Sequence, residues 1–437
     1  MRKQQTTERR DAGEGDRFSG RSRRATTFKG KLDEPIQRWF SITPSYAPAL
    51  VADCADHLGT GLTERYLDPF SGSGTTAVWC RLGALPCTAV EWNPALHVVS
   101  RVKAGWTADP AHFEAAARAF AHTWSVEMPP PKSIAAYLVA HAANMPRISH
   151  PERWWSPAAL AAVTAARVTL ARHPPDPTTR PGIELALLRL LLPVSRARYN
   201  HASITFARDD GRPENAQEVA RSVIDGFCAT ISEMAADLRA VADRPQRLAT
   251  VLRGNALAID AVVPDPGVYT RVICSPPYPN RYSYARETRP HLFFLDLVAD
   301  ARAVGVLDHE AMGGTWGRAT SALTRPHAPA TLAVATVMAP LLDPLRAAHP
   351  LMANYAIRYF NDFWTHIRAL DRAMAHHARL AYVVGNSKLG GVNVPVAEWI
   401  ARLFEADGWR RYGQGIHEMR RRNSRPGLTE SVVFVER

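Results

Sequence analysis

The stretch DPFSGSGTT, residues 68–76, lies between two segments of different periodicity. A short apolar strand, RYLDP (65–69), is expected at its start, and apolar residues recur at helical spacing from Thr76 to Leu82. A second expected strand, CTAVEW (87–92), leads into a helical segment, and a helical pattern at 50–58 comes before the first strand. This β-α-β-α order predicts a parallel sheet that binds ligands at the carboxyl ends of its strands.

The glycines of this stretch indicate a nucleotide-type loop. Gly72 and Gly74 allow the backbone to approach a ligand closely, and the following helix offers free N–H groups. No Lys follows Gly74, so the loop is not the phosphate-cradling type. Glu91 ends the second expected strand, where a carboxylate accepts hydrogen bonds from the hydroxyls of a ribose. The alternatives are a tight turn without a ligand and a solvated Glu91.

The rest of the chain divides the expected fold into parts. Strand signals are absent from 109–246, which is rich in Ala, Leu, Arg and Pro, and resume at 249–253 and 270–274. An amphipathic helix at 355–376, a strand at 379–386, a helix at 396–406 and a terminal hairpin follow. We predict an α/β, Rossmann-like fold of seven mostly parallel strands with a large helical insertion. The expected parts are a disordered basic arm (1–30), a first half (31–108), the insertion (109–246) and a second half (247–437).

A second motif, SPPY (275–278), directly follows the apolar strand at 270–274. Two successive prolines remove N–H donors and leave carbonyl groups free to accept. A planar heterocycle with an amino group suits this loop: its ring stacks on Tyr278, and its N–H hydrogens are accepted by the Ser275 hydroxyl and the Pro276 carbonyl. Cys274, just before the motif, is expected to be a small core residue.

Together the two motifs resemble the S-adenosylmethionine-dependent amino-methyltransferases of DNA, which carry an F-x-G-x-G cofactor loop and a [DNS]-P-P-[YFW] catalytic loop. The resemblance covers 36–100, 249–295 and 378–436, and it implies a class I methyltransferase sheet. The catalytic set that it implies is Ser275, Pro276, Pro277 and Tyr278. The cofactor set that it implies is Phe40, Asp68, Phe70, Ser71, Gly72, Gly74, Thr75, Glu91, Trp92 and Asn255.

Two departures from the family pattern bear on this resemblance. Asn255 stands where Asp is usual in LRGNALAI (252–259), and the large insertion falls between the second and third strands instead of just before the catalytic loop. Trp39–Tyr46 resembles the segment that closes over the methionine end of the cofactor, and VVGNS (383–387) resembles a region that lines the target pocket.

The Ser form of the catalytic motif resembles the members that methylate cytosine at N4. The implied activity is site-specific methylation of a flipped cytosine in double-stranded DNA, with a cognate restriction endonuclease or defence-system proteins as candidate partners. An adenine-N6 or RNA amino-methyltransferase of the same fold is the alternative. A non-catalytic nucleic-acid-binding protein is the third hypothesis.

The net charge agrees with a polyanionic partner. The chain has 53 Lys and Arg against 41 Asp and Glu, a net charge of +12, although an Arg-rich genome gives the same bias. Candidate nucleic-acid contacts are Arg281, Tyr282, Arg286 and Arg421, and the alternative is a solvated Arg face or exposed turn. Arg196, Arg198, Tyr199 and His201 make the insertion a candidate recognition module or a packing element.

The remaining composition bounds the setting of the protein. Five cysteines without a C-x-x-C pair support neither a disulfide framework nor a zinc site, and we expect no metal. No long apolar run is present, so we expect a cytoplasmic protein with no membrane association.

Overall fold

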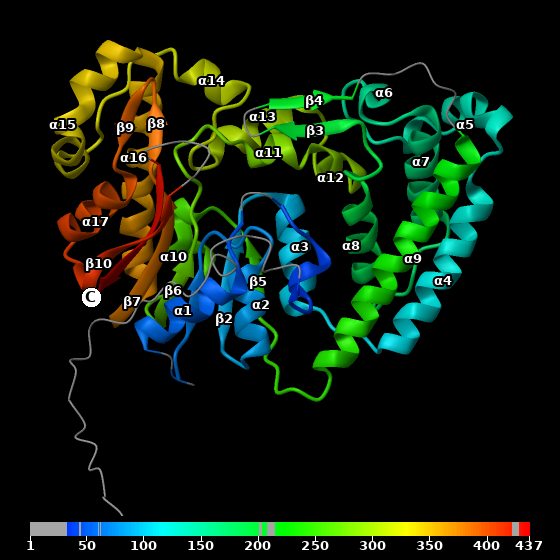
Figure 1. Ribbon diagram of the computed structural model, residues 1–437, viewed down its shortest axis with the longest axis horizontal. Helices are drawn as coiled ribbons and strands as arrows, with labels where there is room; N and C mark the ends of the chain where they lie inside the picture. Colours follow the sequence, from blue (N-terminus) through cyan, green and yellow to red (C-terminus); the bar gives the residue numbers. More distant parts are fainter. Residues whose placement is uncertain are drawn as a thin grey trace, which may run out of the picture.

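The computed structural model describes residues 33–42, 45–59, 61, 63–200, 203–207, 215–421 and 428–437, with the backbone alone at 199, 200, 203, 420 and 421. The basic arm expected at 1–30 lies outside these residues. Helices alternate with the strands of one large sheet, and a mostly helical insertion separates β2 from β5 (Figure 1).

The described residues form the expected seven-stranded sheet, with strand order β10-β11-β7-β6-β1-β2-β5. Strands β5, β2, β1, β6 and β7 run parallel, and β11 is antiparallel to both of its neighbours. The α/β Rossmann-like class is therefore confirmed. The strands are β1 (Tyr66–Asp68), β2 (Cys87–Glu91), β5 (Thr250–Arg253), β6 (Tyr269–Cys274), β7 (Met374–Gly385), β10 (Arg410–Arg421) and β11 (Thr429–Glu436).

Alternate side chains of the strands enter two different cores, as a period of two requires. Ile273 and Phe434 join the core that also contains α1, α2 and α3, whereas Val272 and Val433 join the core that contains α16 and α17. Because both faces are covered, the central strands are apolar without alternation. The covering helices are α1 (Pro48–Leu58), α2 (Thr75–Leu82), α3 (Pro94–Gly105), α10 (Ile259–Val262), α16 (Pro350–Ala373) and α17 (Val396–Ala406).

The segment between β6 and β7 builds a helical region above the carboxyl ends of the strands (Figure 1). A small hairpin after β7 lies in the same region. The helices are α11 (Tyr284–Glu287), α12 (Arg289–Phe294), α13 (Ala301–Glu310), α14 (Arg318–Ala322) and α15 (Leu332–Ala348), and the hairpin strands are β8 (Ser387–Leu389) and β9 (Val392–Val394).

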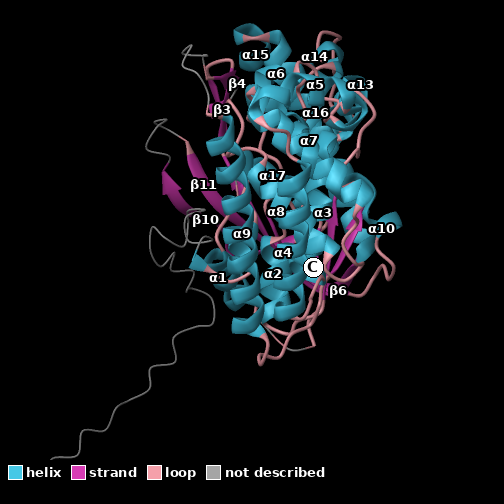
Figure 2. Ribbon diagram, turned by 90° about the vertical axis from the view of Figure 1, so that its right-hand side faces the viewer, coloured by secondary structure: helices cyan, strands magenta, loops and turns pink. Residues whose placement is uncertain are grey.

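The insertion forms a helical layer beside the sheet and on the α3 side of it, at the right of Figure 1 and in front in Figure 2. Its helices are α4 (Pro110–Glu127), α5 (Ile134–Ala140), α6 (Pro151–Trp154), α7 (Pro157–Arg172), α8 (Arg180–Leu190) and α9 (Ala216–Val241). Short 3-10 turns lie in the insertion and elsewhere at η2 (Gln37–Trp39), η3 (Pro131–Ser133), η4 (Ala142–Asn144) and η5 (Ala256–Ala258).

Two details of the sequence prediction were wrong. The insertion does contain strands, a two-stranded hairpin of β3 (Ala197–Asn200) and β4 (Ser203–Phe206) that pairs with no other strand. These strands are too short and too polar for a period to be visible. Strand β7 begins at Met374 instead of 379, because α16 runs into it without a turn and its exposed start, with His376 and His377, carries no strand pattern.

A buried carboxylate joins the insertion to the segment that precedes β1. Asp237 of α9 is 1% exposed and accepts hydrogen bonds from the backbone N–H of Ile36 (2.8 Å) and the indole N–H of Trp39 (2.9 Å). It also forms an ion pair with Arg38, whose Nε donates at 3.1 Å. One side chain thus accepts from donors of three residues in η2 and just before it.

We expect Asp237→Ala to lower the free energy of unfolding by about 3 kcal/mol or more, because it leaves a partly buried guanidinium and two buried N–H groups without an acceptor. Asp243→Ala, an exposed carboxyl just after the same helix, is the matched control. Urea unfolding followed by circular dichroism measures both. Equal stability of the two variants would contradict this role of Asp237.

Candidate active site

The two sequence motifs lie next to each other at the carboxyl edge of the sheet. Strand β1 ends at Asp68 and pairs with β6, which ends at Cys274, through Tyr66↔Arg271 and Leu67↔Val272. From β1 the chain builds outward through β2 and β5, and from β6 it builds in the other direction. This reversal is a topological switch point, where open α/β sheets bind ligands.

Thr76 links the two motifs directly. Its hydroxyl donates to the Ile273 carbonyl of β6 at 3.0 Å and contacts the Tyr46 hydroxyl at 2.5 Å. Loop 69–74, after β1, and loop 275–278, after β6, therefore begin from strands that are held together at their ends.

The glycines of the first loop have different physical tasks. Gly72 has φ 54°, and a Cβ there would meet nothing closer than 3.9 Å. Gly74 has φ 84°, and a Cβ there would lie 2.9 Å from the Ser100 hydroxyl of α3. Gly72 thus provides the positive φ that the turn requires and leaves open space beside the loop. Gly74 also has a positive φ, and its missing side chain allows α3 to pack closely. Ser71 is buried, and its hydroxyl contacts that of Ser100 at 2.5 Å.

Two buried carboxyl groups flank this loop. Asp68 is fully buried: its Oδ1 accepts from the Phe70 N–H at 3.0 Å, and its Oδ2 has no partner among the described residues. Burial raises the pKa of Asp68 to about 8. Glu91 accepts from the Gly72 N–H at 2.6 Å and the Asn93 N–H at 2.8 Å, and burial raises its pKa to about 7. Both carboxyls would ionise more readily beside a positive ligand.

Segment 37–40 is fastened to the same loop by a buried ammonium group. Lys103 of α3 is 0% exposed, and its Nζ donates to the carbonyls of Ser73 (2.8 Å) and Gln37 (3.0 Å). The Gln37 amide donates to the carbonyl of Thr75, the first residue of α2. Phe40, expected near the cofactor, is buried in this segment. The sequence did not indicate a role for Lys103, because a lysine within a helical segment is common and belongs to no motif here.

The predicted residues after β2 and β5 both bond to the end of α13. The Trp92 indole N–H donates to the Leu307 carbonyl at 3.0 Å, and the Asn255 amide donates to the Glu310 carbonyl at 2.9 Å. The Asn255 oxygen accepts from the Leu257 N–H. Helix α13 therefore ties together the loops that follow these two strands. Phe70, on the β1 loop, instead packs edge-on against His366 of α16 at 4.9 Å.

The SPPY loop leaves the sheet at Ser275. Its hydroxyl lies 3.5 Å from the Tyr278 hydroxyl, too far for a strong hydrogen bond. Among the described residues, no hydrogen bond to the Pro276 carbonyl is present. The Pro277 carbonyl accepts from the buried hydroxyl of Tyr359 at 2.8 Å. The loop is thus anchored at its third residue, Pro277.

Tyr359 and Gly385 support this loop. Gly385 belongs to the VVGNS stretch that was expected to line the target pocket, whereas no sequence signal marked Tyr359. Tyr359 lies on α16, eighty-two residues after Pro277. Gly385 ends β7, where a Cβ would lie 2.8 Å from the ring of Tyr278. Only the fold brings Tyr359 to the motif, so no local pattern identifies it.

The candidate nucleic-acid contacts differ in exposure. Arg281 is exposed, and Tyr282 is half-buried against Tyr284. The Arg286 side chain is 15% exposed and pairs with Glu287 at 3.2 Å, and Arg289 lies over the rings of Trp154 and Trp316. A solvated arginine face is therefore not formed in this segment. Arg421 lies in β10, and its side chain is outside the described residues, as is His201 of the insertion.

The chain matches no known protein family, and no curated protein is significantly similar to it. Among the residues that the structure describes, no helix combines the length and apolarity needed to cross a membrane. Within the same residues, no three His, Cys, Asp or Glu side chains are grouped as metal ligands.

The raised pKa of Asp68 predicts a pH dependence of stability. The folded state keeps this proton up to about pH 8, whereas the ordinary pKa of Asp is 3.8, so the unfolded state binds fewer protons between these values. The free energy of unfolding should therefore fall as the pH rises from 5 to 9, and Asp68→Asn should reduce this fall. Thermal unfolding at several pH values measures it, with Asp243→Asn as the exposed control; parallel pH profiles for Asp68→Asn and the unsubstituted chain would contradict it.

Proposed function

We propose that this protein is an S-adenosylmethionine-dependent DNA methyltransferase that acts on the exocyclic N4 amino group of cytosine. The observation that carries the proposal is the adjacency of the DPFSGSG and SPPY loops at the ends of β1 and β6. A loop that binds the methyl donor and a loop that binds the amino group can serve one reaction only when both lie at the same edge of the sheet.

The residues around the first loop fit the implied methyl donor. Asp68 offers an unpartnered, buried carboxyl oxygen, and Gly72 leaves open space beside the backbone. Each oxygen of Glu91 already accepts one N–H and keeps further lone pairs, as the hydroxyls of a ribose require. When bound, S-adenosylmethionine supplies a methyl group on a positively charged sulfonium, and two carboxyls favour a positive ligand.

On the substrate side, the loop after β6 would polarise the amino group. The exocyclic nitrogen of cytosine is a weak nucleophile because its lone pair is delocalised into the ring. Acceptance of its two N–H hydrogens by Ser275 and Pro276 favours a tetrahedral nitrogen, whose lone pair can attack a methyl group. Tyr278 would hold the ring by stacking, with the base outside the duplex. The excess proton leaves to solvent or through the Ser275 hydroxyl.

No covalent intermediate is needed in this scheme. Cys274 precedes the slot, but it is fully buried and burial raises the pKa of its thiol well above the ordinary value. A thiol of this kind is a poor nucleophile, because only the thiolate attacks readily.

The test is methyl transfer from labelled S-adenosylmethionine to DNA and to RNA, followed by nucleoside analysis. We expect label in N4-methylcytosine of double-stranded DNA, and a loss of roughly 100-fold in kcat for Ser275→Ala through the loss of a preorganised acceptor. Label in N6-methyladenine or in RNA would favour the alternative amino-methyltransferase. Tight cofactor binding without any transfer would favour a non-catalytic nucleic-acid-binding protein.

Gly385→Ala tests the placement of Tyr278. The new Cβ would lie 2.8 Å from the ring, so the ring must move, and a shift of about 1 Å in a positioned group costs roughly 100-fold in rate. We expect kcat to fall while the dissociation constant of the cofactor, measured by calorimetry, stays unchanged. Gly305→Ala is the control, since a Cβ on that helical glycine meets nothing closer than 3.9 Å. Full activity of Gly385→Ala would refute the role of this contact.

A further inference from the structure

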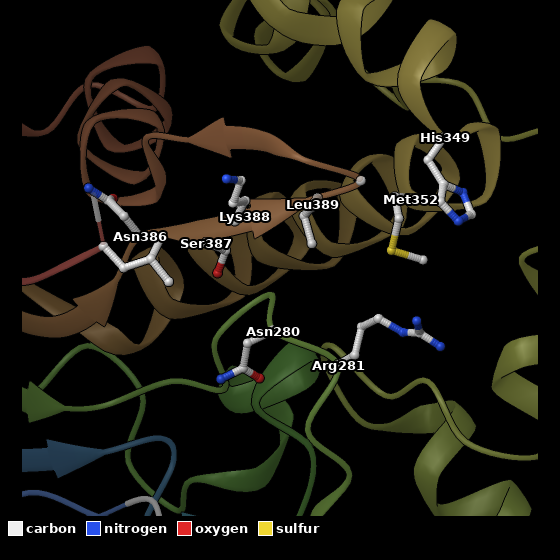
Figure 3. Close-up of a pocket in the computed structure, with 10 residues that line it drawn as sticks. Asn280, Arg281, His349, Met352, Asn386, Ser387, Lys388 and Leu389 are labelled. Carbon is white, nitrogen blue, oxygen red and sulfur yellow. The ribbon is translucent and has the colours of Figure 1, made fainter. Parts of the chain in front are cut away.

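A pocket of about 250 Å³ lies beside the SPPY loop, between the segment that follows it and the β8–β9 hairpin (Figure 3). One wall begins two residues after Tyr278, at Asn280, and the other begins directly after Gly385, at Asn386. Because Gly385 touches the Tyr278 ring, both walls continue directly from the proposed base slot. Two residues of extended chain reach about 7 Å, so the pocket is within one nucleotide of that slot.

The polar groups that face this pocket are hydrogen-bond donors. Ser387 is only 3% exposed, its hydroxyl has no partner among the described residues, and Figure 3 shows it pointing toward Asn280. The Asn280 oxygen already accepts from the Tyr282 N–H, so its amide N–H groups remain for a ligand. Arg281, on the same segment as Asn280, adds a guanidinium, and Lys388 and His349 add an ammonium group and an imidazole to the lining (Figure 3).

The backbone of Arg281 has the strain of a functional position. Its φ is 64°, unusual for a residue with a side chain, and its N–H donates to the Tyr355 hydroxyl at 3.2 Å. The Thr315 hydroxyl donates to its carbonyl at 3.3 Å. A strained conformation that is fixed from both sides is typical of a ligand-binding residue.

The residue types that line the pocket indicate the chemical class of its ligand. Among the described residues that line the pocket there is no Asp or Glu, and no Phe, Tyr or Trp on which a base can stack. A cluster of donors without a carboxylate or an aromatic face suits an anionic, tetrahedral group.

We propose that this pocket binds a backbone phosphate next to the methylated nucleotide of DNA. This inference rests on the proposed function and assigns it a contact with the substrate. Arg281 would supply the charge, and Ser387 and Asn280 would fix the position of the phosphate, which sets how far the extruded base enters the slot.

Salt-dependent binding of a fluorescein-labelled duplex that carries the methylated site tests the pocket. Loss of one phosphate contact lowers the slope of log K against log [salt] by about 0.9, so Arg281→Gln should show this change together with roughly tenfold weaker binding. Arg281→Lys should keep the slope. Ser387→Ala should weaken binding without changing the slope, because a hydroxyl carries no charge. Arg244→Gln, an exposed arginine near the amino ends of the strands, is the matched control.

Ethylation interference then locates the phosphate. Ethylation of a phosphate beside the methylated base should impair binding of the unsubstituted protein and should have no effect on Arg281→Gln. Identical slopes and interference patterns for Arg281→Gln and Arg244→Gln would overturn the inference. A second result would also overturn it: binding of 2′-deoxycytidine 5′-monophosphate that depends on Arg281, with the same salt slope of duplex binding for Arg281→Gln and the unsubstituted protein. The pocket would then bind a free nucleotide. These measurements read binding alone, so a failure of methyl transfer is distinguishable from a failure of the pocket.

Discussion

The pairing of β1 with β6 is the contact on which the rest of the site depends. Strand β1 has three residues, and its partners in β6 lie about 205 residues further along the chain. Its Tyr66 and Leu67 point into different cores, so the helical layers on both faces of the sheet hold this short strand in place. Because loops extend from the ends of both strands, this register places Asp68 and Ser275 at the same edge of the sheet.

The insertion leaves and re-enters the fold at one point, which explains why it does not disturb the sheet. The Ala249 N–H bonds to the Ala104 carbonyl, so the two ends of the insertion are adjacent. Buried Arg81 reinforces this closure by donating to the Trp106 carbonyl at 2.8 Å and to Gln246 at 3.0 Å. The insertion contacts the candidate site indirectly, through Asp237 and the segment that Lys103 fastens to the loop after β1.

The sequence predicted features that depend on neighbouring residues and did not predict contacts between residues far apart in the chain. Hydrophobic runs predicted the seven strands and the helical insertion, and the glycine and proline residues indicated the two motifs. Each of these features has a short-range signature in the sequence. Tyr359 lies beside the second motif only through long-range packing, and the VVGNS stretch indicated the pocket region without the approach of Gly385 to Tyr278. The arginine-rich segment after SPPY was hardest to interpret, since exposed Arg281 and the mostly buried Arg286 have the same sequence signature. The β3–β4 hairpin was missed because its four-residue strands are too short and too polar to show a period.

The order of strands along the chain also has a consequence for biosynthesis. At a synthesis rate of roughly 5–20 residues per second, β6 emerges about 10–40 s after β1. During that interval β1 has β2 on one side and no strand on the other. The insertion is made within the same interval, and its helices pack mainly on one another and on α3 and η2. Such contacts form faster than distant strand pairing. The loop that follows β1 therefore has a folded helical neighbour before its partner strand β6 exists.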